Sequence, residues 1–260
     1  MPERADLAPN PVYAAARAHA QGSRIGRHAH RRAQLIVLAQ GALRLECDDR
    51  VLTVPPGQAA FLPGALPHAA TYGERSVVSI AYFEPADFPG LPQESLLFPA
   101  SDLIRALIAR ALELSAASAW SEADRRAMQV LADEIARAPR GARGLGLGQD
   151  ARLRRVTEAL LADPADRRTL PQWAAQAAVP ERTLARLFAR ETGLSFARWR
   201  ARLQIARAVE WLAAGRPVTQ IAYDLGYASP SGFTAMFTRE TGAPPQGWLA
   251  RETRAPGHAG

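Results

Sequence analysis

The sequence contains no lysine, so arginine supplies all 32 of its basic side chains. Its single cysteine, Cys47, excludes an internal disulfide and any zinc site built from several cysteines. No apolar run reaches the roughly 18 residues that a membrane-spanning helix needs, and the N-terminus lacks the charged-then-apolar pattern of a secretory signal. These absences argue against a membrane protein or a secreted one and favour a cytoplasmic address.

The net charge of +7 is unevenly distributed. Residues 1–150 carry 16 arginines and 16 acidic side chains, whereas residues 151–260 carry 16 arginines and 9 acidic side chains. Coding bias can explain the use of arginine in place of lysine, but it does not explain the asymmetry. A basic C-terminal part beside a neutral N-terminal part indicates a polyanion-binding module joined to a different domain.

Short apolar runs separated by turn residues fill the chain from about Ile25 to Pro85. Leu43, Leu45 and Cys47 alternate with polar residues, which is the period of a half-buried strand. Evenly spaced short strands predict a small antiparallel barrel or sandwich, and we expect a barrel within residues 1–97.

The next segments are predicted to be a helical hairpin and a linker. Residues 98–138 carry two apolar stripes of helical period, with Ser101 and Ser121 as N-caps. The hairpin either only covers the barrel or also forms a dimer interface, because its stripe is wider than one barrel face needs. Glycine and proline are frequent in residues 139–150, which predicts a flexible linker. We therefore expect an α+β protein of two domains, with an all-α domain over residues 151–253.

A short sequence motif occurs twice in this C-terminal part. Leu187–Gly193 recurs as Met236–Gly242, and each copy closes an apolar segment of helical period. Two helix-turn-helix units in tandem are the simplest interpretation, which makes double-stranded DNA the first partner to consider. The intervening helix, from about Ser195 to Ala214, would span about 30 Å, close to one turn of B-DNA.

The two presumed recognition helices differ in the faces that they offer to DNA. Arg182 and Arg186 lie opposite the apolar face of the first, and arginine can contact guanine or clamp phosphate. The corresponding face of the second is small and uncharged, so we expect the first unit to provide most of the sequence discrimination. The candidate DNA-binding residues are Arg182, Thr183, Arg186, Arg198, Ser231, Thr234 and Ala235.

These segments resemble the DNA-binding domain of the AraC/XylS family of bacterial transcriptional regulators. The resemblance rests on Ile221–Tyr227, followed by Phe233, Phe237 and Gly242, and on Arg182–Phe188. It implies sequence-specific binding to promoter or operator DNA under the control of a small-molecule effector. RNA polymerase and a second copy of the chain are further partners that it suggests.

The histidines of the N-terminal part form a pattern of their own. Gly22, His28, His30, Gln34 and Gly41 have the spacing G-x5-H-x-H-x3-Q-x6-G, and Gly57, Pro63 and His68 follow as G-x5-P-x4-H. This pattern resembles the two cupin motifs, with Gln34 in place of the usual glutamate.

The cupin resemblance implies that the histidines meet inside the barrel, and three interpretations stay open. In the first, His28, His30 and His68 hold a divalent transition metal. In the second, a metal-free pocket that includes Gln34 binds the effector directly. In the third, the histidines are merely packed. Tyr72, Tyr82 and Phe61 are further candidates to line the cavity, although core packing explains them equally well.

The favoured reading is a transcription factor that combines a cupin-like effector sensor with a two-unit DNA reader, and that is not an enzyme. One alternative is a metal-dependent cupin enzyme with an accessory DNA-binding module. Gln34 in place of a carboxylate argues against it, as does the lack of a second set of acid-base residues. The other alternative is an architectural DNA-binding protein with a vestigial barrel.

Overall fold

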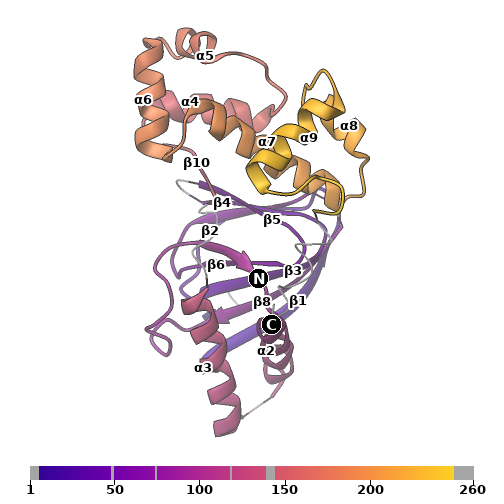
Figure 1. The fold of residues 1–260 in the computed structure, drawn as a ribbon. Coiled ribbons are helices and arrows are strands. Elements are labelled where there is room, and N and C mark those ends of the chain that lie inside the picture. Colours follow the sequence, from indigo (N-terminus) through magenta and orange to yellow (C-terminus); the bar gives the residue numbers. More distant parts are fainter. Residues whose placement is uncertain (1–5, 48–49, 74, 118, 139–143, 249–260) are drawn as a thin grey trace. The chain divides into compact units, whose positions relative to one another are not determined.

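The computed structural model describes residues 6–47, 50–73, 75–117, 119–138 and 144–248 (Figure 1). The chain divides into two compact units, and among the described residues the second unit begins at Gly144 and also includes Arg50 and Val51. None of the helices in the described ranges is both long and apolar enough to cross a membrane.

The first unit is built from antiparallel strands in two sheets that share an apolar core. One sheet has the order β1 (Val12–His19), β8 (Ser76–Phe83), β3 (Ala33–Gln40), β6 (Gln58–Leu62) and β9 (Leu96–Pro99). The other contains, in order, β5 (Arg50–Val54), β4 (Leu43–Cys47), β7 (His68–Tyr72) and β2 (Arg24–His28). The expected antiparallel β domain is confirmed, in the form of two facing sheets rather than one closed ladder.

Strand β3 is buried on both faces, which explains its unbroken apolar sequence. Leu35 and Val37 belong to the core between this sheet and the helices, whereas Ile36 and Leu38 belong to the core between the two sheets. Because side chains alternate along a strand, Gln34 lies on the same face as Ile36, toward the interior of the sandwich. A polar residue is thereby placed at one end of the inter-sheet core.

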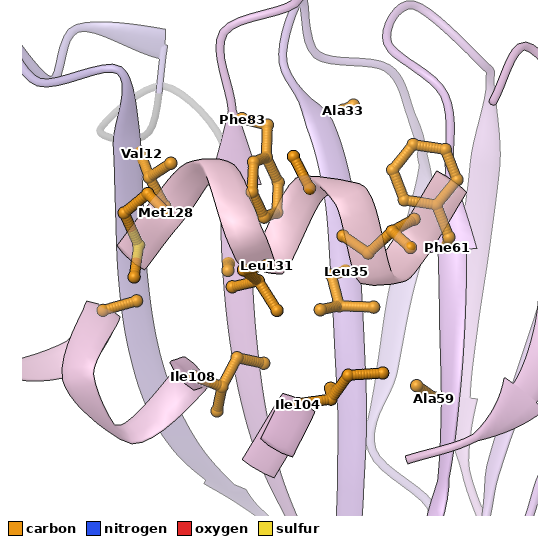
Figure 2. Close-up of a cluster of buried hydrophobic side chains, with 14 of the residues drawn as sticks. Val12, Ala33, Leu35, Ala59, Phe61, Phe83, Ile104, Ile108, Met128 and Leu131 are labelled. Carbon is orange, nitrogen blue, oxygen red and sulfur yellow. The ribbon is translucent and has the colours of Figure 1, made fainter. Parts of the chain in front are cut away.

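The helical hairpin consists of α2 (Asp102–Leu114) and α3 (Glu122–Arg137). Ser101 and Ser121 cap these helices as expected, and each accepts a hydrogen bond from a backbone N–H of the first turn. Figure 2 shows side chains of both helices against the outer face of the sheet, which accounts for most of the wide apolar stripe. The predicted boundary between residues 97 and 98 is wrong, since it cuts through β9, which pairs with β6.

The second unit contains the two expected helix-turn-helix units. The first is formed by α4 (Ala151–Ala162), α5 (Leu170–Gln176) and α6 (Glu181–Thr192), and the second by α8 (Val218–Asp224) and α9 (Pro230–Thr241). Between them runs α7 (Phe196–Ala213), whose buried residues contribute to two separate apolar cores. Leu184, Leu187 and Phe188 form the buried face of α6, as the sequence predicts.

The repeated sequence has a repeated structure. Gly193 and Gly242 end α6 and α9 with φ angles of 71° and 76°, a left-handed conformation that favours glycine. The threonine before each glycine donates its hydroxyl to the carbonyl four residues earlier, at 2.7 Å in the first copy and 2.8 Å in the second. The repeat therefore encodes the same helix ending twice.

The predicted flexible linker of residues 139–150 is wrong in its second half. Residues 144–150 join the second unit and include the short strand β10 (Leu145–Gly146). The indole Nε1 of Trp199 donates a 2.7 Å hydrogen bond to the carbonyl of Gly146, and Leu145 is buried in the first helical core. Apolar anchors among the glycines hold this segment in place, while residues 139–143 lie outside the described ranges.

Candidate functional site

Three histidines meet at one end of the β sandwich. His28 ends β2 and lies directly opposite His68, the first residue of β7, and His30 lies in the connection from β2 to β3. One ligand atom of each histidine lies within 4.8 Å of those of the other two. The ring centroids of His28 and His68 are 4.4 Å apart. The structure therefore brings together the residues that the cupin-like spacing singles out.

Each of these rings is fixed by a backbone carbonyl. Nδ1 lies 2.9 Å from the carbonyl of Gly26 in His28, 2.7 Å from that of Arg32 in His30, and 2.9 Å from that of Leu66 in His68. A carbonyl oxygen can only accept, so each Nδ1 carries the proton, and in the neutral ring Nε2 keeps its lone pair. This orientation is the one that metal-binding histidines adopt in proteins.

Gln34 extends the cluster toward the neighbouring strand. Its Oε1 lies 3.2 Å from Nε2 of His30, and its Nε2 donates to the hydroxyl of Tyr82 at 3.3 Å. Both Oε1 and the lone pair of His30 Nε2 are acceptors, so a cation between them would satisfy both. Two ligands of one metal ion at about 2.1 Å are separated by about 3.0–3.4 Å, which matches this contact.

A metal-free arrangement also satisfies this row of side chains. If the amide of Gln34 turns over, the hydroxyl of Tyr82 donates to its oxygen and its nitrogen donates to Nε2 of His30. Burial raises the pKa of Tyr82 to about 12, so its hydroxyl keeps its proton at neutral pH. The cluster is therefore suited either to a transition metal or to direct hydrogen bonding with a ligand.

Burial lowers the pKa of His68 from 6.5 to about 4, with smaller contributions from the charges of His28 and His30. In the metal-free protein, the unfolded state binds more protons than the folded state between these two values. The stability of the first unit is therefore expected to be lost as the pH falls from about 6.5 toward 4, by up to about 1.4 kcal/mol per pH unit. Urea unfolding in chelator at pH 7, 6 and 5 would measure this slope.

The matched control for the pH series is His68→Gln, whose side chain cannot take up a proton in this range. It should show a shallower pH dependence than the wild-type chain in the same chelator. Equal slopes for the two proteins would show that His68 is not the group responsible.

Sequence reasoning missed the residues that position His30. The buried guanidinium of Arg32 donates to the carbonyls of Ala8 and Asn10, at 2.7 and 2.9 Å. The carboxylate of Asp6 accepts hydrogen bonds from the backbone N–H groups of Arg31 and Arg32. The chain before β1 therefore holds the carbonyl that orients His30, and no motif spacing signals this contact.

The aromatic candidates separate from one another in the structure. Tyr82 reaches the histidine cluster, and its ring centroid lies 5.2 Å from that of His30. Tyr72 instead stacks on His19 at 3.8 Å. Phe61 faces the helical hairpin on the outer side of its sheet (Figure 2), so it does not line the site. Of these three aromatic candidates, only Tyr82 contacts a residue of the cluster.

Helix α6 presents unpaired arginines to solvent. Its N-cap is Pro180, whose carbonyl accepts the first hydrogen bonds of the helix. Arg182 and Arg186 are both exposed and lie one helical turn apart on one face, beside the half-buried Thr183. Most arginines in the described part of the second unit form hydrogen bonds or ion pairs with other residues of the chain. Those without a partner in the described part of this unit are Arg155, Arg182, Arg186 and Arg202.

The face of α9 that carries Ser231, Thr234 and Ala235 is small and uncharged there, as the sequence predicts, while Arg239 in the last turn is exposed and pairs with Glu240. Its N-cap Ser229 accepts from the N–H of Gly232 and contacts the hydroxyl of Ser231 at 2.9 Å. Ser231 and Ala235 are exposed and Thr234 is half-buried.

Arg198 is placed differently from the other DNA-binding candidates. It lies in the first turn of α7, and its Nε is 3.6 Å from a carboxylate oxygen of Glu240 near the end of α9. An ion pair this exposed contributes little stability. The guanidinium of Arg198 is therefore already paired with a carboxylate before it meets DNA.

Comparison with known proteins places both units. Residues 10–147 match the family described as AraC-like ligand binding domain, and residues 173–251 match a helix-turn-helix domain. The chain belongs to the AraC family. The predicted resemblance is thereby confirmed, and this AraC family protein combines a helix-turn-helix DNA-binding domain with an N-terminal ligand-binding domain.

Individual relatives of this AraC family member are also transcriptional regulators. It is 32% identical over 226 residues to the HTH-type transcriptional regulator NimR of Escherichia coli (strain K12), which covers 87% of this chain and 82% of NimR. It is 27% identical to RipA of Corynebacterium diphtheriae over 83% of this chain and 60% of RipA. Among solved structures, ToxT of Vibrio cholerae O395 aligns over 94% of this chain and 100% of its own with 12% identity and a TM-score of 0.40.

Proposed function

We propose that the histidine cluster is the effector site of this regulator and that its occupancy changes how the second unit binds promoter or operator DNA. The observation that carries this proposal is the arrangement of the rings. His28, His30 and His68 are each anchored through Nδ1, which leaves Nε2 as the ring atom that can bind a ligand, and Nε2 of His30 faces Oε1 of Gln34 at 3.2 Å.

A divalent transition metal fits the residues that are present. Neutral imidazoles favour zinc, copper, nickel or cobalt over magnesium or calcium, which prefer oxygen ligands. His28, His30 and His68 would hold the ion, and the facing acceptor of Gln34 supports a fourth contact. When bound, the metal would supply a Lewis-acidic position for an effector atom.

Regulation is a better-supported role than catalysis. The relatives with assigned names are transcriptional regulators. We therefore propose a cytoplasmic, non-enzymatic regulator, and we do not favour the metal-dependent cupin enzyme.

On the DNA side, we propose that α6 reads bases through Arg182 and Arg186, with Thr183 beside them. Ser231, Thr234 and Ala235 on α9 would add phosphate and apolar contacts, and Arg198 a phosphate contact. RNA polymerase and a second copy of the chain are proposed partners. Leu103 and Val130 support the second, because the helical hairpin leaves them 47% and 42% exposed.

The link between the two sites is tested by measuring DNA binding at different states of the histidine cluster. The DNA site is first selected from a random library with the full chain. Its affinity is then compared for chelated protein and for protein loaded with zinc, nickel, cobalt or copper. We expect a change of about 5- to 150-fold, the usual range of coupling between two sites.

The control for this experiment is the His30→Ala variant, which should bind the selected site equally well with and without metal. If the wild-type chain responds to no metal, the same assay is repeated with a small-molecule library. DNA affinity that stays constant under every condition would contradict effector control through this cluster.

A further inference from the structure

The two helix-turn-helix units have separate apolar cores. One core contains residues of α4, α5 and α6 with Phe196, Trp199 and Leu203 of α7. The other contains residues of α8 and α9 with Ala201, Ala208 and Val209 of α7. Between them lies a cavity of about 260 Å³, lined by Arg167 and Gln204 together with Gly226 and Tyr227 of the turn between α8 and α9. Apolar packing therefore does not fix the distance between the units at this point.

A single buried amide bridges this junction. Gln204 lies in the middle of α7 and is 8% exposed. Its Nε2 donates to the carbonyl of Pro164 at 3.2 Å and to that of Leu225 at 3.4 Å, and its Oε1 accepts from the hydroxyl of Tyr227 at 2.8 Å. Pro164 belongs to the loop after α4, in the first helix-turn-helix unit, whereas Leu225 and Tyr227 belong to the second helix-turn-helix unit.

The geometry of this amide restricts how the two helix-turn-helix units can move relative to each other. The two hydrogens on one nitrogen point in fixed directions, so the carbonyls of Pro164 and Leu225 must keep a set separation. Arg167 strengthens the same junction by donating to the carbonyl of Gly226. Moving one helix-turn-helix unit against the other would break several of these hydrogen bonds. It would leave buried polar groups unpaired, which costs free energy.

We propose that Gln204 is a positioning residue that sets the spacing and rotation at which α6 and α9 meet DNA. The inference rests on the proposed function, in which both helices contact the duplex. One extra base pair displaces the second half-site by about 3.4 Å and by about a tenth of a turn. With Gln204 in place, α6 and α9 cannot shift to follow that displacement, so binding weakens. Without Gln204, the two helices can shift and keep their contacts.

The test replaces Gln204 with methionine, which has a similar length and no hydrogen-bonding amide. Full-length wild-type and Gln204→Met proteins are titrated against the selected DNA site and against versions with one or two base pairs inserted or deleted between the contacts of α6 and α9. We expect wild type to lose about tenfold or more per inserted base pair, the order of one lost set of base contacts. The variant should lose only about threefold.

Two further variants separate positioning from general stability. Val209→Ala truncates a buried residue of the second core on α7 and touches none of the bonds at the junction, so it should keep the wild-type spacing preference. Tyr227→Phe removes one of the three hydrogen bonds of Gln204 and should relax the preference in the same direction but less. It also serves as the test if Gln204→Met does not fold.

The outcomes are distinguishable. If Gln204→Met weakens binding by the same factor at every spacing, as a merely destabilised protein would, the positioning role is wrong while the proposed function stands. If the wild-type chain itself tolerates every spacing, α9 does not bind DNA in fixed register with α6, and both the inference and this part of the proposed function are wrong.

Discussion

Replacing Arg182 and Arg186 together with alanine is expected to abolish discrimination between the selected DNA site and random DNA. Both side chains are exposed on the outer face of α6 and have no partner among the described residues. An arginine that contacts a base pair contributes about 1–3 kcal/mol. Each single substitution should therefore weaken specific binding by roughly 5- to 150-fold. Titration against specific and random duplexes at one fixed salt concentration measures both effects.

The matched control is Arg190→Ala, one turn further along the same helix. Arg190 is also exposed, but it forms an ion pair with Glu191, so less of its charge is available to DNA. Its replacement should lower the affinity for both duplexes slightly and equally. If the double variant does the same, Arg182 and Arg186 contact phosphate only, and the salt dependence of binding should then fall by about one ion per lost contact.

The helical unit was largely predictable from the sequence because its signals are local. Helix caps, glycine endings and apolar stripes act over about four residues, and each reappears in the structure. Strand β1 was missed, since an alanine-rich run has little strand propensity and is ordered by pairing with β8. The fixed segment before α4 was missed for a related reason. Its glycines suggest flexibility, while the carboxylate of Glu191 accepts from the N–H groups of Gln149 and Asp150.

The histidine cluster and the Gln204 junction differ in how far the sequence predicts them. Motif spacing located the three histidines, but not the carbonyls that select their tautomers or the role of Arg32 in holding one of those carbonyls. Gln204 carried no signal at all, because a glutamine on an arginine-rich helix is expected to face solvent. Its burial depends on contacts with Pro164 and Leu225, which lie in two turns about 60 residues apart in the chain, and such non-local contacts leave no periodic trace.

Replacing His28 and His30 together with alanine is expected to remove all bound divalent metal. The untagged wild-type chain, after incubation with zinc or nickel and exhaustive dialysis, should retain about one ion per chain by elemental analysis, since one ligand atom from each of three imidazoles lies within 4.8 Å of the other two. The double variant keeps only His68 and Gln34. Losing a residue that merely orients a ligand costs about 10- to 100-fold in affinity, so losing two ligands should abolish retention.

Two controls make this metal measurement decisive. His19→Ala removes a histidine that stacks on Tyr72 outside the cluster, and it should leave the metal content unchanged. Magnesium and calcium should not be retained by any of the proteins, because the cluster offers nitrogen rather than carboxylate ligands. If neither wild type nor variant retains a metal, the row from Tyr82 through Gln34 to His30 acts by hydrogen bonding alone. The effector should then be an organic molecule that stabilises the wild-type chain against heat but not the double variant.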